Sequence, residues 1–208
     1  MSTPPRITCL FFTDATVTAF LNAPAGRALA GDLLVECGFA PALGFALNLE
    51  TPANYPGVAG LLGETDIGAL AHAAELLPAP ILLAAGAPVS PVALRSALAR
   101  LRRPDERLRA ITLLVPLAAA RALGSALAVA DRFALAWDAA AFPHEELVEF
   151  AQWLAAEKLV HAGNFAGLFP YADDAPDRAH AARLAALLAP AAAQHAGLPR
   201  ELLVARAK

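Results

Sequence analysis

Short, continuous apolar runs recur along this chain, and segments with helix-forming patterns separate them. The predicted strands are residues 6–12, 41–50, 80–86, 110–116 and 132–137. Their apolar residues are continuous rather than alternating, which is typical of parallel strands buried on both faces. Parallel strands need crossover connections, and these are right-handed. The pattern therefore predicts an α/β fold: an open doubly wound parallel sheet of about five strands with helices on both faces.

Helices are predicted between the strands and after the last one. They cover residues 16–37, 66–77, 90–102 and 117–130, and then 143–160 and 176–195. Ser90 is expected to cap the third of these helices, because Pro91 follows it at the first helical position. The strand signal disappears after Asp138, so we expect a sandwich domain over residues 1–140. Residues 141–208 are then a C-terminal helical extension packed on it.

Composition limits the partners that this alanine-rich chain can have. Hydrophobic residues make up 58% of the sequence and charged residues only 17%, so we expect a contact in a homo-oligomer or with a partner protein to cover apolar surface. The net charge of −3 argues against binding to nucleic acid or to anionic membranes. Charge is unevenly placed, since residues 95–109 are basic and residues 138–177 are acidic.

The first residues and the two cysteines indicate a cytoplasmic protein. The N-terminus has one arginine and an apolar run too short for the core of a signal peptide. Residues 110–130 are long enough for a bilayer, but Pro116 and Arg121 divide them into a strand and a helix. Cys9 and Cys37 are predicted to be a pair of lone buried thiols rather than a disulfide, with Cys9 inside a strand. For Cys37, which lies near a helix end, exposure to solvent is the alternative.

The predicted fold also predicts where a ligand binds. In open α/β sheets a ligand sits outside the carboxyl ends of the strands, where the winding changes direction. Asp14 and Asp138 follow the first and last predicted strands, so they are the candidate catalytic residues. The candidate ligand-binding residues are Thr13, Thr16, Asn48, Glu50, Gly86 and Ser90. Gly86 and Ser90 precede a helix, and a helix N-terminus can hold an anion.

Asp14 has two interpretations. It can cap the helix that begins after it, by accepting hydrogen bonds from the first backbone N–H groups. Alternatively, "TDATVT" reads D-x-T-x-T after an apolar strand, which resembles the nucleophile motif of haloacid-dehalogenase-like phosphatases and P-type ATPases. That resemblance implies phosphoryl transfer with Asp14 as nucleophile and with Thr16 and Thr18 beside the phosphoryl group. Thr16 stands where most soluble members carry a second Asp.

Other chemical signatures are missing or have a structural explanation. The chain holds no G-x-x-x-x-G-K-[ST] or G-x-G-x-x-G motif, no G-x-S-x-G elbow and no H-E-x-x-H pair, so the sequence identifies no cofactor. Asp173, Asp174, Asp177 and His180 cluster, but a helix cap with a dipole partner explains them without a metal. The aromatic segment 161–174 is expected to be a loop, either a lid or an anchor for the extension.

Three functions remain open from the sequence. The leading one is binding of a small anionic metabolite at the C-terminal ends of the strands, with or without catalysis. The second is a non-catalytic subunit or adaptor that binds a partner protein, which suits the apolar composition and the lack of catalytic motifs. The third is phosphoryl transfer through Asp14.

Overall fold

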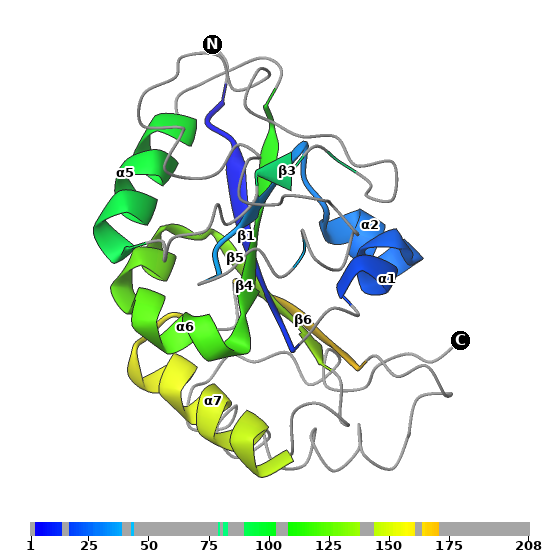
Figure 1. Cartoon of the computed structure of the whole chain (residues 1–208), viewed down its shortest axis with the longest axis vertical. Coiled ribbons are helices and arrows are strands. Elements are labelled where there is room, and N and C mark those ends of the chain that lie inside the picture. The colour runs from blue at the N-terminus through cyan, green and yellow to red at the C-terminus, as the bar shows by residue number, and fades with distance from the viewer. Residues whose placement is uncertain are drawn as a thin grey trace.

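The structure is a computed structural model that describes residues 3–13, 17–38, 43, 79, 81–82, 90–102, 108–137, 144–160 and 164–170. Its centre is one sheet of parallel strands (Figure 1). The described strands are β1 (Arg6–Phe12), β2 (Leu33–Glu36), β3 (Ile81–Leu82), β4 (Ala110–Pro116), β5 (Arg132–Trp137) and β6 (Phe165–Pro170). The predicted open doubly wound α/β fold is therefore confirmed.

The strand order is β3-β2-β4-β1-β5-β6, so β1 lies inside the sheet between β4 and β5. All its described pairings are parallel, including those of Phe11 with Val115 on β4 and with Leu135 on β5. Successive residues of β1 point to opposite faces. Because both faces are covered, six of its seven residues are buried. This explains why an uninterrupted apolar run forms the central strand.

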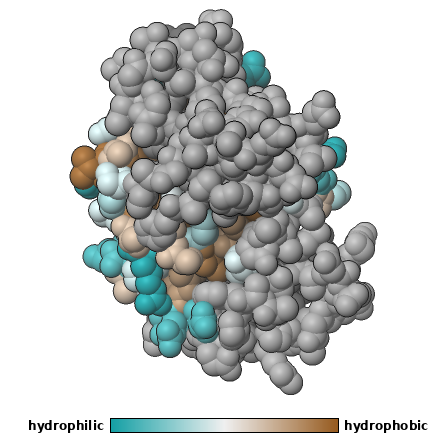
Figure 2. Space-filling view, in the orientation of Figure 1, coloured by the Kyte–Doolittle hydropathy of each residue, from teal (hydrophilic) through white to brown (hydrophobic). Residues whose placement is uncertain are grey.

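Helices cover both faces of the sheet, as Figure 1 shows. One face carries α5 (Pro91–Leu101), α6 (Leu117–Leu123), the 3-10 helix η3 (Gly124–Val129) and α7 (His144–Ala156). The other carries α1 (Val17–Asn22) and α2 (Pro24–Leu29). On the first face, the Phe11 ring stacks on Phe133 at 6.1 Å and meets Phe150 of α7 edge-on at 5.0 Å. In Figure 2, hydrophilic residues lie along the outer side of this helical layer, near α6 and α7.

The second strand was predicted in the wrong place. Residues 33–36 form β2, although they fall inside the predicted helix 16–37. Pro24 begins a separate helix, α2, which ends at Leu29, and Gly31 then passes close to the backbone of Ala110. A side chain at Gly31 would meet the Ala110 carbonyl oxygen at 2.4 Å, so the chain can turn into the sheet only with glycine here. Of the predicted strand 41–50, only Leu43 is described, and it is helical.

The loop predicted over residues 161–175 is also wrong in part, because Phe165–Pro170 form β6. This strand pairs in parallel with β5, and the register of the pairing shifts between Phe133 and Ala134. The shift explains why the residue pattern of β6 differs from that of a regular strand. The strand belongs to the sheet, although it lies within the predicted helical extension. The division of the chain near residue 140 stays a prediction.

The described helices α5, α6 with η3, and α7 follow the expected boundaries closely, whereas the predicted helices 66–77 and 176–195 lie outside the described residues. Ser90 caps α5, and its hydroxyl oxygen accepts a hydrogen bond from the Ala93 amide at 3.1 Å. Residues 117–130 change from α6 to η3 at Gly124, where φ is +40°. Among the described helices, none is long and apolar enough to cross a membrane.

Candidate functional site

The winding of the chain changes direction at β1. After β1 the chain passes to α1 on one face, whereas after the adjacent strands β4 and β5 it passes to α6 and α7 on the opposite face. Segments that leave neighbouring strands toward opposite faces open a crevice between them at the carboxyl edge of the sheet. The candidate site therefore lies at the C-terminal end of β1.

The described walls of this crevice come from the ends of three strands. In register, Phe12 at the end of β1 pairs with Pro116 of β4 and with Ala136 of β5. Thr13 follows Phe12 directly and is half-buried. α6 begins at Leu117 without an intervening loop, so its first turn adjoins the same edge. Phe12 and Ala136 are buried in the core, so Pro116 and Thr13, both half-buried, are the strand-end residues of these three strands with exposed surface, and the Thr13 hydroxyl supplies a polar atom.

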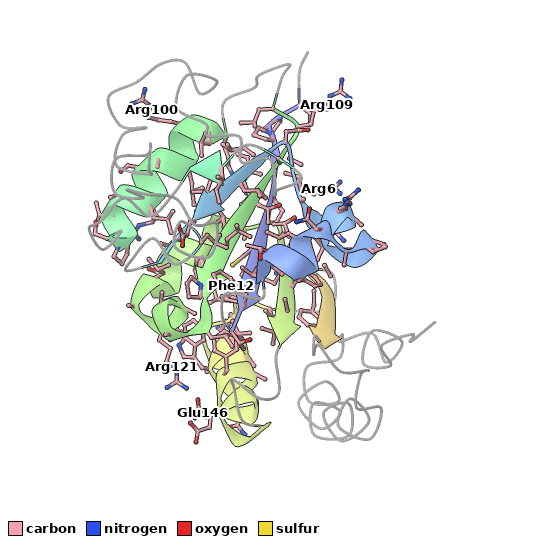
Figure 3. The ribbon with its side chains drawn as sticks, turned by 45° about the vertical axis from the view of Figure 1, so that its right-hand side comes forward. Arg6, Phe12, Arg100, Arg109, Arg121 and Glu146 are labelled. Carbon is pink, nitrogen blue, oxygen red and sulfur yellow. The ribbon has the colours of Figure 1, made fainter. Side chains whose placement is uncertain are left out.

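Charged side chains lie at both ends of the sheet. Figure 3 shows Phe12, Arg121 of α6 and Glu146 of α7 in the lower half of the molecule, and Arg100 and Arg109 at the top. Arg121 and Glu146 are both exposed. In this view Arg121 points away from Phe12, toward the outer side of the helical layer. The labelled cation nearest the crevice edge therefore does not point into it.

The sequence-predicted site residues are only partly described. Thr13 lies at the expected strand end, directly after β1. Ser90 is the N-cap of α5, so its structural role is confirmed, and its role in ligand binding stays a prediction. The other six candidates lie outside the described residues: Asp14, Thr16, Asn48, Glu50, Gly86 and Asp138.

Sequence reasoning missed Glu36 because it placed the second strand too late. Glu36 ends β2, is fully buried, and accepts a hydrogen bond from the Leu43 amide at 2.8 Å through Oε1. It thereby ties the connection after β2 to the carboxyl edge of the sheet. The signal was present in "DLLVE", a short apolar run with a β-branched residue that ends in an acid.

The two cysteines are both buried and free, so the predicted pair of lone buried thiols is confirmed and the alternative of an exposed Cys37 is wrong. Cys37 lies after β2, and its amide donates to the Leu114 carbonyl at 2.8 Å, which draws it under the helical layer. Burial raises the pKa of the Cys37 thiol, and the Glu36 carboxylate raises it further. Burial also raises the pKa of Cys9, with a smaller contribution from Cys37. Neutral buried thiols are poor nucleophiles.

Metal binding has no support from the described residues. In those ranges, no group of three or more His, Cys, Asp or Glu side chains is arranged to hold a metal ion. The predicted cluster at residues 173–180 lies outside them.

No protein-family model matches this sequence, and no curated protein sequence matches it. Solved structures do resemble its fold. The cobyrinic acid a,c-diamide synthase from Mycobacterium smegmatis with bound ADP and magnesium is 16% identical, with a TM-score of 0.56 over 88% of this chain and 81% of that chain. The Cyanothece McdA–ATP complex is also 16% identical, with a TM-score of 0.56 over 89% and 79%.

A chain of the MinC:MinD cell division protein complex from Aquifex aeolicus is 15% identical, with a TM-score of 0.54 over 78% of this chain and 68% of that chain. At these identities the likeness concerns the fold alone. These neighbours have the P-loop architecture of the ParA/MinD type, and this chain shares their open doubly wound sheet.

One of these structures contains ADP and magnesium, and the residues at the end of β1 can be tested for a fit to such a nucleotide. Phosphate loops of this architecture have the form strand, G-x-x-x-x-G-K-[ST], helix. Here β1 ends at Phe12 and α1 begins at Val17, and residues 13–16 between them read T-D-A-T. Neither glycine nor lysine is present. The residues at this strand end therefore do not fit a nucleoside triphosphate.

Proposed function

We propose that this protein binds a small anionic metabolite in the crevice at the C-terminal end of β1. The observation that carries the proposal is the change of winding at β1, because β4 and β5 on either side send the chain to the opposite face. A crevice in this position is where open α/β sheets bind ligands. The half-buried Pro116, in register with Phe12, would supply part of its apolar wall.

The polar residues at the strand ends have separate roles in this proposal. Thr13, Thr16 and Ser90 would donate hydroxyl hydrogen bonds to the anionic group, and the backbone at Gly86 would allow close approach. Asp14, Glu50 and Asp138 would accept hydrogen bonds from hydroxyl or ammonium groups on the same metabolite, and Asn48 could do either. A ligand that combines one anionic group with such donors, as a hydroxy acid or an amino acid does, suits this set.

A ligand screen tests the proposal. Small carboxylates and phosphate monoesters are added to the purified protein, and ligands that raise its melting temperature are then measured by calorimetry. We expect binding of one such ligand to weaken about tenfold in Thr13→Val, because a hydrogen bond to a charged group is lost. Thr8→Val is the matched control, since Thr8 lies on β1 five residues earlier and is buried. Equal weakening in both variants would contradict a site at the strand end.

A second candidate is a non-catalytic subunit or adaptor that binds a partner protein. The mismatch between an ATP-binding fold and the T-D-A-T connection favours it, as does the apolar composition. The MinC:MinD complex shows that one protein with a similar fold assembles with another protein. This candidate predicts that the purified chain self-associates when its partner is absent. A monodisperse monomer at high concentration, measured by light scattering, would count against it.

A further inference from the structure

We infer that the ligand of this crevice carries no polyphosphate, and that the protein neither binds nor hydrolyses ATP at the end of β1, despite its fold. The inference rests on the proposed function, because it names the ligand class of the same site. It depends on three properties of the segment from Phe12 to Gly26: its length, its hydrogen-bond donors and its charge.

The connection is too short to surround a chain of phosphates. A phosphate loop places at least six residues, G-x-x-x-x-G, between the strand and the lysine that opens the helix. Residues 13–16 are all that separates Phe12 from Val17, and both ends are fixed because Phe12 and Val17 are buried. A connection of this length can turn the chain from strand to helix, and it cannot wrap around two or three phosphate groups.

The connection also lacks the donors that polyphosphates need. Glycine lets consecutive backbone N–H groups converge on one anion, and lysine neutralises the β- and γ-phosphates. From Cys9 onward the first glycine is Gly26, and the first lysine in the whole chain is Lys158. Asp14 places a negative charge where the phosphate loop has none. A polyanion is therefore repelled at the position where the fold would bind it.

The helix after β1 cannot compensate, since α1 has only six residues. The dipole of a helix depends on many aligned peptide groups, and α1 supplies fewer than two turns. Pro24 begins α2 directly afterwards, and Gly26 of α2 packs tightly against α1. A side chain at Gly26 would come within 2.0 Å of the Phe20 carbonyl oxygen. This contact fixes the C-terminal end of α1.

A compact anion needs neither a long loop nor a lysine, and it is repelled less by Asp14 because it carries less negative charge. One carboxylate or one phosphate monoester needs two or three donors, which a hydroxyl and the first backbone N–H groups of a short connection can supply. The half-buried Pro116 at this edge suits the apolar body of a small metabolite, whereas Phe12 and Ala136 are buried in the core. The ligand class is therefore a small metabolite with a single anionic group.

Calorimetry with ATP and ADP, each with and without magnesium, tests the inference on the full chain, together with phosphate release from ATP. We expect no saturable binding below about 1 mM and no release above the uncatalysed rate. Asp14→Ala should behave in the same way, because the short connection and the missing donors remain. ATP binding at about 10 µM by the wild-type chain, or by Asp14→Ala, would overturn the inference.

The small-anion screen separates this outcome from failure of the proposed function. Binding of a carboxylate or phosphate monoester without ATP binding supports both. Binding of ATP overturns the inference while leaving a ligand site in place. Binding of neither overturns the proposed function, and with it the ligand class.

Discussion

The two edges of the sheet use polar residues differently. At the N-terminal edge, carboxylates and a hydroxyl bind the backbone where strands begin. Asp131 Oδ2 accepts from the Ile7 amide at 2.8 Å, and Asp32 Oδ2 accepts from the amides of Arg109 and Ala110 at 2.6 and 2.9 Å. Thr112 joins Gly31 and Leu29 in the same region. These residues hold the strands in register.

At the C-terminal edge, Glu36 makes the corresponding contact with Leu43, and the chain changes winding direction two strands away, at β1. The candidate ligand-binding residues follow the strands here rather than precede them. A polar residue at the start of a strand therefore predicts a structural role, whereas a polar residue after the end of a strand predicts a role in binding. Substitutions at the N-terminal edge should cost stability, and substitutions at the crevice should change binding.

The largest expected effect is on the labelling rates of the two cysteines. These rates test whether the C-terminal edge of the sheet is closed to solvent at β2. Burial raises the pKa of both thiols, so neither thiolate forms near neutral pH in the folded protein. Iodoacetamide at pH 8 should label Cys9 and Cys37 at least a hundredfold faster in urea than in the folded state, as mass spectrometry can measure. Rapid labelling of Cys37 alone would show that this edge opens.

The same shifts predict a pH dependence. A folded-state pKa above the unfolded value stabilises the protein fully below the ordinary thiol pKa, near 9. As the pH rises above 9, the unfolded chain loses these protons and the folded protein keeps them. The free energy of unfolding should therefore fall with increasing pH in this range, and a double Cys→Ala variant should lose that part of the slope.

Thr112→Val should have the largest effect on stability at the N-terminal edge. The fully buried hydroxyl donates to the Leu29 carbonyl at 2.8 Å and accepts from the Gly31 amide at 2.9 Å. Valine leaves both backbone groups without this partner, so we expect a loss of roughly 2–4 kcal/mol in urea unfolding. Thr8→Val, also on a buried strand, is the control and should cost less than about 1 kcal/mol. Equal losses would mean that the hydroxyl contacts do not matter.

Asp131→Ala should cost somewhat less, roughly 1–3 kcal/mol, because the Ile7 amide loses its acceptor. The side chain is partly exposed, so its ion pair with Arg102, at 2.8 Å, contributes little. Asp131→Asn keeps an acceptor oxygen and should recover most of the loss. If Asp131→Asn is as unstable as Asp131→Ala, the loss of stability comes from the charge of Asp131 and not from its acceptor oxygen.

Ser90→Ala should cost about 1 kcal/mol through loss of the α5 cap. Ser96→Ala, on the exposed side of the same helix, is the control and should have almost no effect. If a crevice ligand binds Ser90, affinity should fall in the first variant by more than its stability loss explains. Unchanged affinity would remove Ser90 from the proposed site.

Asp14→Asn should have the smallest effect on stability, below about 0.5 kcal/mol, because asparagine caps helices as well as aspartate does. Phosphoryl transfer through Asp14 also predicts unchanged stability, but with turnover reduced by several orders of magnitude. Phosphate release from a panel of phosphorylated substrates distinguishes them. Equal phosphate release by the wild-type protein and by Asp14→Asn would indicate that Asp14 has only a structural role.

Periodicity predicted most of the fold. β1, β4 and β5 were found because each is long and continuously apolar, and α5 because Ser90 and Pro91 mark its start. β2 and β6 were missed for tertiary reasons. Gly31 turns β2 into the sheet by packing on Ala110, and β6 adds to β5 with a register irregularity. Neither contact can be recognised from a local pattern.

The candidate site was less predictable than the fold. The rule for strand ends selected Thr13, which does lie at the C-terminal end of β1, because β1 was placed correctly. It selected Asn48 and Glu50 instead of Glu36, because the end of the second strand was misplaced by more than ten residues. Strand order decides which strand ends meet, and it depends on pairings between distant segments. The sequence alone therefore supplied candidates without their arrangement.

An NMR titration tests most directly whether the C-terminal end of β1 is the ligand site. Inorganic phosphate and acetate are added separately to the ¹⁵N-labelled protein, and shifts are compared between the two edges. We predict saturable changes at the amides of Thr13, Val17 and Leu117, with those of Ile7, Asp32 and Ala110 unchanged. Saturable changes confined to the N-terminal edge, or none at either edge with any anion, would contradict the account.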